Sequence, residues 1–242
     1  METVQNATIK SIVTNDFRAA AVFEKYSLDF CCKGGVTIDE ACSVANIDAA
    51  LVYNDLAQLV NGAREKMPHF AEWPVDELTD YIVNVHHTYV REATPVITAH
   101  SQKVASVHGN NHPEVIAIAR HFESVAAELQ SHMMKEERVL FPYFRALVKA
   151  KRGELKFVPP PFGTVQHPIQ VMEAEHQAAG EEMNAIHSLA GNYVPPKDAC
   201  TTYCVSFKEL QQFEQDLHEH VFLENNILFP KAVAIERELM AS

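Results

Sequence analysis

The sequence predicts an all-α protein, an antiparallel four-helix bundle preceded by a small helical N-terminal domain. Long stretches place apolar residues three or four positions apart, which is the spacing of one helix face. No alternation of apolar and polar residues, as in a half-buried strand, persists anywhere in the 242 residues. Loops that contain proline separate the long stretches, and helices joined by short loops pack as antiparallel neighbours.

The N-terminal domain is predicted to span residues 1–60. Its apolar residues follow helical spacing from Ile12 to Leu28, and a Gly-Gly pair then interrupts the pattern. Residues 61–75 carry glycine and proline without clear periodicity, so we expect a linker there.

The bundle is predicted to span residues 76–242. Its first helix ends at Gly109 and contains Pro95, which is expected to kink it. The second helix begins at Pro113, a residue suited to a first helical turn, and ends before Pro142 with a short continuation.

The third and fourth helices each follow a proline-rich loop. The third covers residues 169–192, and the fourth runs from Cys200 to Pro230. Cys200 and Cys204 share one face of the fourth helix, where we expect them to pack in the core.

Composition excludes several classes of protein. The net charge of −12 argues against a nucleic-acid or anionic-membrane surface, because phosphate binding requires clustered Lys and Arg. The N-terminus lacks the basic start and apolar block of a signal peptide, and the longest apolar runs are short. Five cysteines, an odd number, predict reduced thiols rather than a disulfide framework. We therefore expect a soluble cytoplasmic protein without a membrane partner.

A repeated motif carries the main chemical signal. The stretches SHMMKEERVLFP (131–142) and EHVFLENNILFP (219–230) each place a glutamate four residues after a histidine and Phe-Pro five residues later. The repeated residues are His132, Glu136, Phe141 and Pro142, then His220, Glu224, Phe229 and Pro230. Residues four apart on a helix share a face, so each pair can direct an imidazole and a carboxylate at one point.

Both pairs lie on apolar stripes, formed by Val125, Leu129, Val139 and Leu140 around His132 and by Phe213, Leu217, Ile227 and Leu228 around His220. Burial of an unpartnered carboxylate costs several kcal/mol, whereas a metal ion makes the same charge a ligand. The repeat therefore favours a metal site over two solvent-facing helix turns.

The other two bundle helices supply further histidines. His176 lies on an apolar stripe of the third helix, and the first helix offers both His86 and His87. Periodicity does not choose between these two. One histidine per helix and two glutamates make a set that suits iron, manganese or zinc better than a soft metal. Carboxylates between two groups of histidines can bridge a metal pair.

These motifs resemble hemerythrin-like di-iron bundles, and more closely the bacterial "repair of iron centres" family of iron–sulfur cluster repair proteins. The resemblance covers nearly the whole chain and rests on SHMMKEE, LENNILFP, VMEAEH and, in the N-terminal domain, KYSLDFCCKGG. It implies a hemerythrin-like bundle, an N-terminal two-cysteine domain and a non-haem centre of two iron ions.

The resemblance also implies the ligands, which are His87, His132, Glu136, His176, His220 and Glu224, with the two glutamates bridging. It favours His87 over His86. Oxygen-carrying hemerythrins have five histidines, so a four-histidine set weakens an oxygen-carrier interpretation.

Three further residues are candidates for the chemistry. Cys31 and Cys32 match the family's paired cysteines and could hold iron in transit, react with nitric oxide or touch a damaged cluster. Glu128 lies one turn before His132 and could line a route for iron or protons, as could Glu175. We expect the remaining histidines to be surface or linker residues.

The implied function is repair of iron–sulfur clusters damaged by nitrosative or oxidative stress, by supplying iron. The alternatives are a nitric oxide reductase that produces nitrous oxide and a hemerythrin-like oxygen binder or sensor. The expected partners are damaged iron–sulfur proteins and nitric oxide. An apolar stripe of the N-terminal domain could support a homodimer; its residues are Val13, Phe17, Ala20 and Phe23.

Overall fold

The structure is a computed structural model that describes residues 6–30, 33–61 and 69–241. Within these ranges the chain is helical, with no β-strand and one isolated bridge between Thr8 and Thr37. The predicted all-α class is confirmed. None of the described helices is long and apolar enough to cross a membrane.

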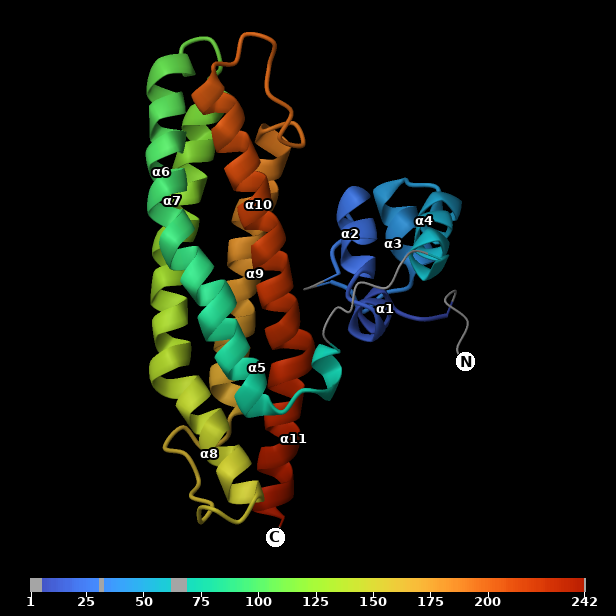
Figure 1. Cartoon of the computed structure of the whole chain (residues 1–242), viewed down its shortest axis with the longest axis vertical. Coiled ribbons are helices and arrows are strands. Elements are labelled where there is room, and N and C mark those ends of the chain that lie inside the picture. The colour runs from blue at the N-terminus through green and yellow to red at the C-terminus, as the bar shows by residue number, and fades with distance from the viewer. Residues whose placement is uncertain (1–5, 31–32, 62–68, 242) are drawn as a thin grey trace. The chain divides into compact units, whose positions relative to one another are not determined.

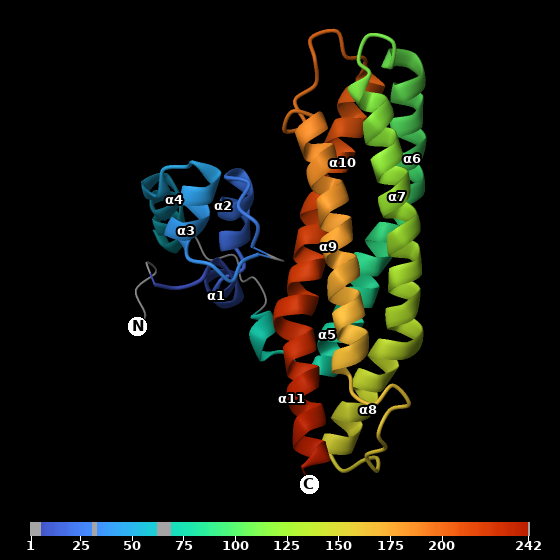
Figure 2. The ribbon, with the colours of Figure 1, turned by 180° about the vertical axis from the view of Figure 1, so that it is seen from behind.

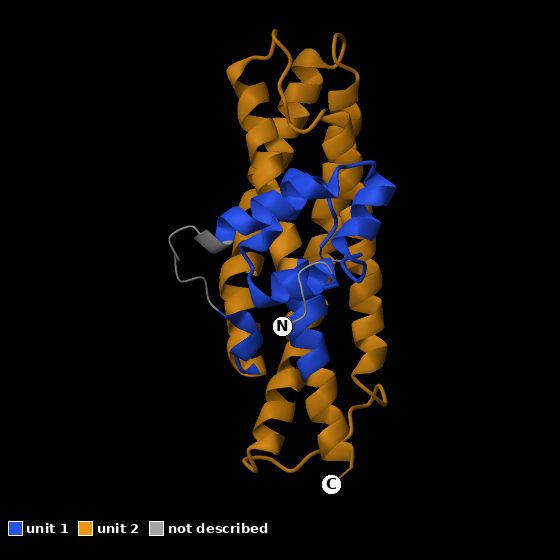
Figure 3. Ribbon diagram, turned by 90° about the vertical axis from the view of Figure 1, so that its right-hand side faces the viewer, with its two compact units in different colours: residues 1–74, 221–231 blue, residues 75–220, 232–242 orange. Residues whose placement is uncertain are grey.

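The chain divides into two compact units (Figure 3). Unit 1 comprises residues 1–74 and 221–231. The helices of its first segment are α1 (Ile9–Asn15), α2 (Ala19–Lys25), α3 (Ile38–Ala45), α4 (Ala49–Asn61) and the 3₁₀ turn η1 (Phe70–Glu72).

Aromatic and aliphatic side chains form the core of unit 1. The rings of Phe17 and Phe30 lie 5.6 and 5.8 Å from the ring of Phe222. Val13 and Phe23 are buried inside this unit. The apolar stripe proposed for a homodimer is therefore largely internal, and it offers little exposed surface to a second copy.

Unit 2 comprises residues 75–220 and 232–242 and contains most of the bundle. The helices and π-helical segments from residue 75 onward are α5 (Val75–Ile82), η2 (Val83–His87), α6 (Thr88–His108), α7 (Glu114–Lys135), η3 (Glu136–Leu140), α8 (Phe141–Lys151), α9 (Gln166–Leu189), α10 (Thr201–Leu223), η4 (Glu224–Leu228) and α11 (Phe229–Met240). The long helices α6, α7, α9 and α10 run side by side with alternating direction (Figures 1 and 2). The antiparallel four-helix bundle is thus confirmed, while the predicted domain boundaries stay a prediction.

Two helices continue past the prolines that were expected to end or nearly end them. Pro142 and Pro230 are each the second residue of a further helix, α8 and α11. A π-helical segment precedes each proline, and the proline then falls in the first turn of the new helix, where its missing N–H leaves no broken hydrogen bond. Pro95 lies in the interior of α6, within a helix as the sequence predicted.

The π-helical segments also shift the buried face. Val139 was expected on the buried stripe of His132, yet it is 50% exposed, while Leu140 is buried. A π turn holds one more residue than an α turn, so the residues after Glu136 rotate relative to an α-helical register.

A buried carboxylate fastens the loop before α9. Glu236 is 1% exposed and accepts hydrogen bonds from Tyr143 Oη (2.7 Å), Thr164 Oγ1 (2.7 Å) and the backbone N–H of Val165 (3.0 Å). Its charge therefore compensates one of the unpaired N–H groups at the start of α9.

Candidate metal centre

The site lies where π-helical segments interrupt three of the bundle helices. His87 ends η2, Glu136 begins η3 and Glu224 begins η4. π-helical turns occur often at functional sites because the extra residue lets a side chain leave the α-helical register. His176 comes from α9, which is uninterrupted at this level.

The structure brings the six nominated side chains into two overlapping groups. One contains His87, Glu136, His220 and Glu224, and the other contains His132, Glu136, His176 and Glu224. Within each group the ligand atoms lie within 4.8 Å of one another, and all six residues are buried. Both glutamates belong to both groups, whereas His86 belongs to neither.

The two histidines of the second group face each other through their Nε2 atoms. His176 Nε2 lies 2.9 Å from His132 Nε2. Two nitrogens that bind one ion at about 2.1 Å and a right angle lie about 3.0 Å apart. This pair therefore has the separation of two ligands of one metal ion.

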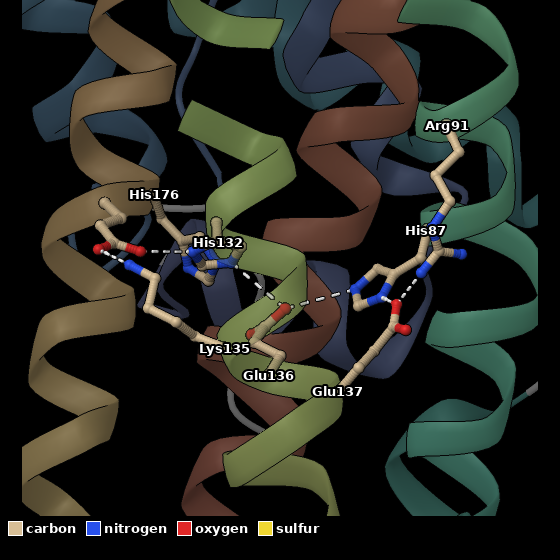
Figure 4. A network of polar contacts seen from close by, with 8 residues as sticks. His87, Arg91, His132, Lys135, Glu136, Glu137 and His176 are labelled. Atoms are coloured by element: carbon tan, nitrogen blue, oxygen red, sulfur yellow. Dashed lines mark hydrogen bonds and ion pairs between the residues drawn. The ribbon is translucent and has the colours of Figure 1, made fainter. Parts of the chain in front are cut away.

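Glu136 occupies the middle of the centre (Figure 4). Its Oε2 atom lies 3.3 Å from His87 Nε2 and 3.3 Å from His132 Nε2. A carboxylate oxygen equidistant from two histidines of different groups faces both groups, and the several lone pairs of a carboxylate allow it to accept more than one partner.

Outer carboxylates hold two of the histidines by their other ring nitrogen (Figure 4). His87 Nδ1 lies 2.7 Å from Glu137 Oε1, and His132 Nδ1 lies 2.9 Å from Glu175 Oε2. An ionised carboxylate only accepts, so each Nδ1 donates and each Nε2 keeps its lone pair for a metal.

Each outer carboxylate also has a cationic partner, Arg91 for Glu137 and Lys135 for Glu175. Burial by itself raises the pKa of Glu175, but hydrogen bonds from Lys135 and His132 outweigh it and hold that pKa below its ordinary value. Glu175 therefore stays ionised and keeps the orientation of His132 fixed.

The donor set fits a pair of divalent transition-metal ions. Four imidazoles and two carboxylates offer nitrogen and oxygen ligands and no thiolate, which suits iron, manganese or zinc. The two carboxylates also supply negative charge inside a buried space, where charge is costly without a partner. When iron is bound, the centre has a metal that can change oxidation state.

Glu128 lies in an open groove between α7 and α9, with a volume of about 590 Å³. His132, Lys135 and Glu175 also line this groove. Glu128 is thus on a surface that leads to a ligand histidine, but it belongs to neither ligand group.

The structure contradicts the predicted burial of one pair of cysteines and does not describe the other pair. Cys31 and Cys32 lie outside the described residues. Cys200 and Cys204 are exposed, so the expectation that they pack in the core is wrong. The residues of α10 that turn inward at this level are Tyr203 and Phe207, which are both buried.

Sequence reasoning missed how many other histidines pair with acids across the bundle. The pairs are His86–Asp216, His100–Glu209, His112–Asp198, His121–Glu182 and His187–Glu214. Each joins residues distant in sequence, so helical periodicity gave no signal for them. Four of these pairs cross-link neighbouring helical segments, and His112–Asp198 joins two loops.

Comparison with known families agrees with this arrangement. The sequence model of the hemerythrin HHE cation binding domain matches residues 78–232. The chain belongs to the hemerythrin HHE family. A second model, ScdA_N, a domain of unknown function (DUF542), matches residues 5–60.

Similar curated proteins extend over most of the chain. The iron-sulfur cluster repair protein YtfE of Edwardsiella ictaluri is 37% identical over 217 residues, which are 89% of this chain and 91% of the relative. The proteins of the same name from Citrobacter koseri and Escherichia coli O81 are 36% and 35% identical, each over 90% of this chain and 93% of the relative. The resemblance to iron–sulfur cluster repair proteins is therefore confirmed.

Proposed function

We propose that this protein is a di-iron protein that repairs iron–sulfur clusters damaged by nitrosative or oxidative stress, and that it does so by supplying iron. The observation that carries the proposal is that Glu136 and Glu224 belong to both ligand groups. Shared carboxylates suit a bridged ion pair. The similar curated proteins bear the name of iron–sulfur cluster repair proteins.

In this proposal each end of the centre holds one iron. His87 and His220 serve one ion, and His132 and His176 serve the other, with both glutamates between them. Imidazole and carboxylate ligands lose affinity on protonation and lack the soft thiolates that retain metals most firmly. The chain therefore suits storage of iron that is later released.

The remaining candidates take auxiliary roles. Glu128 attracts ferrous ions to the groove beside His132. Cys31 and Cys32 receive iron from the bundle or react with nitric oxide, because a thiolate is the soft ligand that the bundle does not use. Damaged iron–sulfur proteins are the partners, and reduced cysteines fit a cytoplasmic location.

Reduction of nitric oxide is a second candidate for the same centre. Two molecules of nitric oxide, two electrons and two protons give one nitrous oxide and one water. A bridged ferrous pair holds the two electrons, and the shared position of Glu136 between His87 and His132 favours such a pair. Nitrous oxide in the headspace above the reduced protein would identify this activity.

The test is a repair assay with an iron–sulfur enzyme whose [4Fe–4S] cluster nitric oxide has damaged. Protein loaded with ⁵⁷Fe is added under anaerobic conditions, and an equal amount of free ferrous iron serves as the control. We expect faster recovery of enzyme activity with the loaded protein and ⁵⁷Fe in the rebuilt cluster. Recovery no faster than with free iron contradicts the proposal. A Glu136→Ala, Glu224→Ala protein should restore no more enzyme activity than a mixture to which no iron is added.

A further inference from the structure

His86, which is adjacent to His87 in the sequence, has the features of a metal ligand but belongs to neither ligand group. His86 is 1% exposed, and its Nδ1 atom lies 2.9 Å from Asp216 Oδ1. Its Nε2 atom is buried and has no hydrogen-bond partner within the described part of the chain. A buried polar atom without a partner destabilises the fold, so its presence requires an explanation.

The state of His86 matches that of the proposed ligands His87 and His132. Each has a carboxylate at Nδ1, which fixes the tautomer with the proton on Nδ1 and the lone pair on Nε2. A carboxylate at one ring nitrogen, which leaves the lone pair on the other, is the arrangement that metal-binding histidines show in general.

The ring of His86 is stacked on the ring of His220. Their centroids are 5.4 Å apart and their planes differ by 6°. His87 lies 5.0 Å from the same His220 ring. Asp216 is one turn before His220 on α10, so one helix positions both the ligand and the group that orients His86.

We propose that His86 is a fifth imidazole of the metal centre, oriented by Asp216, and that it binds the iron at the His87–His220 end. His86 belongs to neither ligand group, so binding of the iron by His86 requires its ring to move relative to the ring of His220. Coordination would give the buried Nε2 atom a partner.

The consequence is an unequal pair of metal positions. One end then has three histidines and the other has two, while both share the two glutamates. The three-histidine iron is held more tightly, and the ion at the His132–His176 end leaves first. This inference rests on the proposed function, because it names which of the two irons is delivered.

The test compares four ⁵⁷Fe-loaded proteins by Mössbauer spectroscopy and by the rate of iron loss to a chelator. His86→Phe keeps a flat ring for the stack but removes the nitrogen. Asp216→Asn keeps His86 but removes the charge that orients it. His100→Phe is the matched control, because His100 Nδ1 lies 2.7 Å from Glu209 Oε2 and joins α10 to α6, the helix that directly follows η2.

We expect two quadrupole doublets of equal area and two phases of iron loss for the wild type. His86→Phe should merge the doublets and accelerate the slow phase about tenfold, as loss of a metal-tuning group does. Asp216→Asn should accelerate the same phase, and His100→Phe should change neither reading.

Unchanged doublets and unchanged iron loss in both His86→Phe and Asp216→Asn overturn the inference, since stacking alone survives in the Phe variant. If His86→Phe does not fold, the spectrum of Asp216→Asn decides. A wild type that does not bind two irons defeats the proposed function itself, whereas a di-iron wild type with an unaffected His86→Phe defeats only this inference.

Discussion

Removal of the outer carboxylate of Glu137 should weaken metal binding without unfolding the bundle. Glu137 accepts from His87 Nδ1 at 2.7 Å, is 29% exposed and also pairs with Arg91. Glu137→Ala releases the His87 ring and leaves its Nδ1 proton buried without an acceptor. Losses of this kind reduce metal affinity about 10–100-fold, or about 1.4–2.7 kcal/mol.

Glu175→Ala should have a similar effect, because Glu175 holds His132 in the same manner. Glu182→Ala is the control. Glu182 Oε2 lies 2.6 Å from His121 Nδ1, and this pair joins α7 and α9 just as His132 and Glu175 do, but outside the ligand groups.

The assay is an anaerobic competition titration of each protein against a chromophoric chelator of ferrous iron, with circular dichroism as a check of helix content. If these carboxylates orient His87 and His132, the metal complex is weaker for Glu137→Ala and Glu175→Ala only. This orienting role is refuted if both bind iron as tightly as the wild type. It is also refuted if Glu182→Ala weakens binding equally, because the effect would then reflect net charge.

Three more predictions concern stability. The hydrogen bond to Glu214 raises the pKa of His187 against the effect of burial, so this pair stabilises the fold below the unfolded pKa of about 6.5 and loses that effect as pH rises through the folded value. Urea titrations should therefore show His187→Gln about 1–2 kcal/mol less stable than wild type at low pH, with a difference that shrinks at higher pH; a constant difference contradicts this. Glu236→Gln should lower the free energy of unfolding by about 3 kcal/mol, because an amide cannot accept from all three of its donors, and a loss below about 1 kcal/mol contradicts the buried network. Ferrous iron at about 100 times its dissociation constant should stabilise the wild type by about 2.7 kcal/mol in the same titration and leave Glu136→Ala, Glu224→Ala unchanged; stabilisation of that variant would place the metal elsewhere.

The sequence predicted the bundle because its helices are long, amphipathic and separated by proline-containing loops. Its local rules placed helix ends at Pro142 and Pro230, with only a short continuation after Pro142, since they treat a proline after an apolar stretch as a helix end. The π-helical segment before each proline removes that conflict, and only the three-dimensional backbone reveals it.

Part of the candidate site could also be predicted from the sequence. The pairs His132–Glu136 and His220–Glu224 are local, so helical spacing nominated them directly. Helical spacing could not choose between His86 and His87, because two adjacent residues differ only in which neighbouring helix they contact. The outer carboxylates Glu137 and Glu175 were also beyond periodicity, since each contacts a histidine on another helix.

We propose that this bundle holds two irons bridged by Glu136 and Glu224. The most direct test is anaerobic metal analysis with Mössbauer spectroscopy on the wild type and on the Glu136→Ala, Glu224→Ala protein. A bridged pair predicts about two irons per chain with the spectrum of a coupled pair, both lost in the double variant, as expected for shared carboxylate ligands. One zinc ion or no metal in the wild type, or a coupled pair that survives in the double variant, would contradict it.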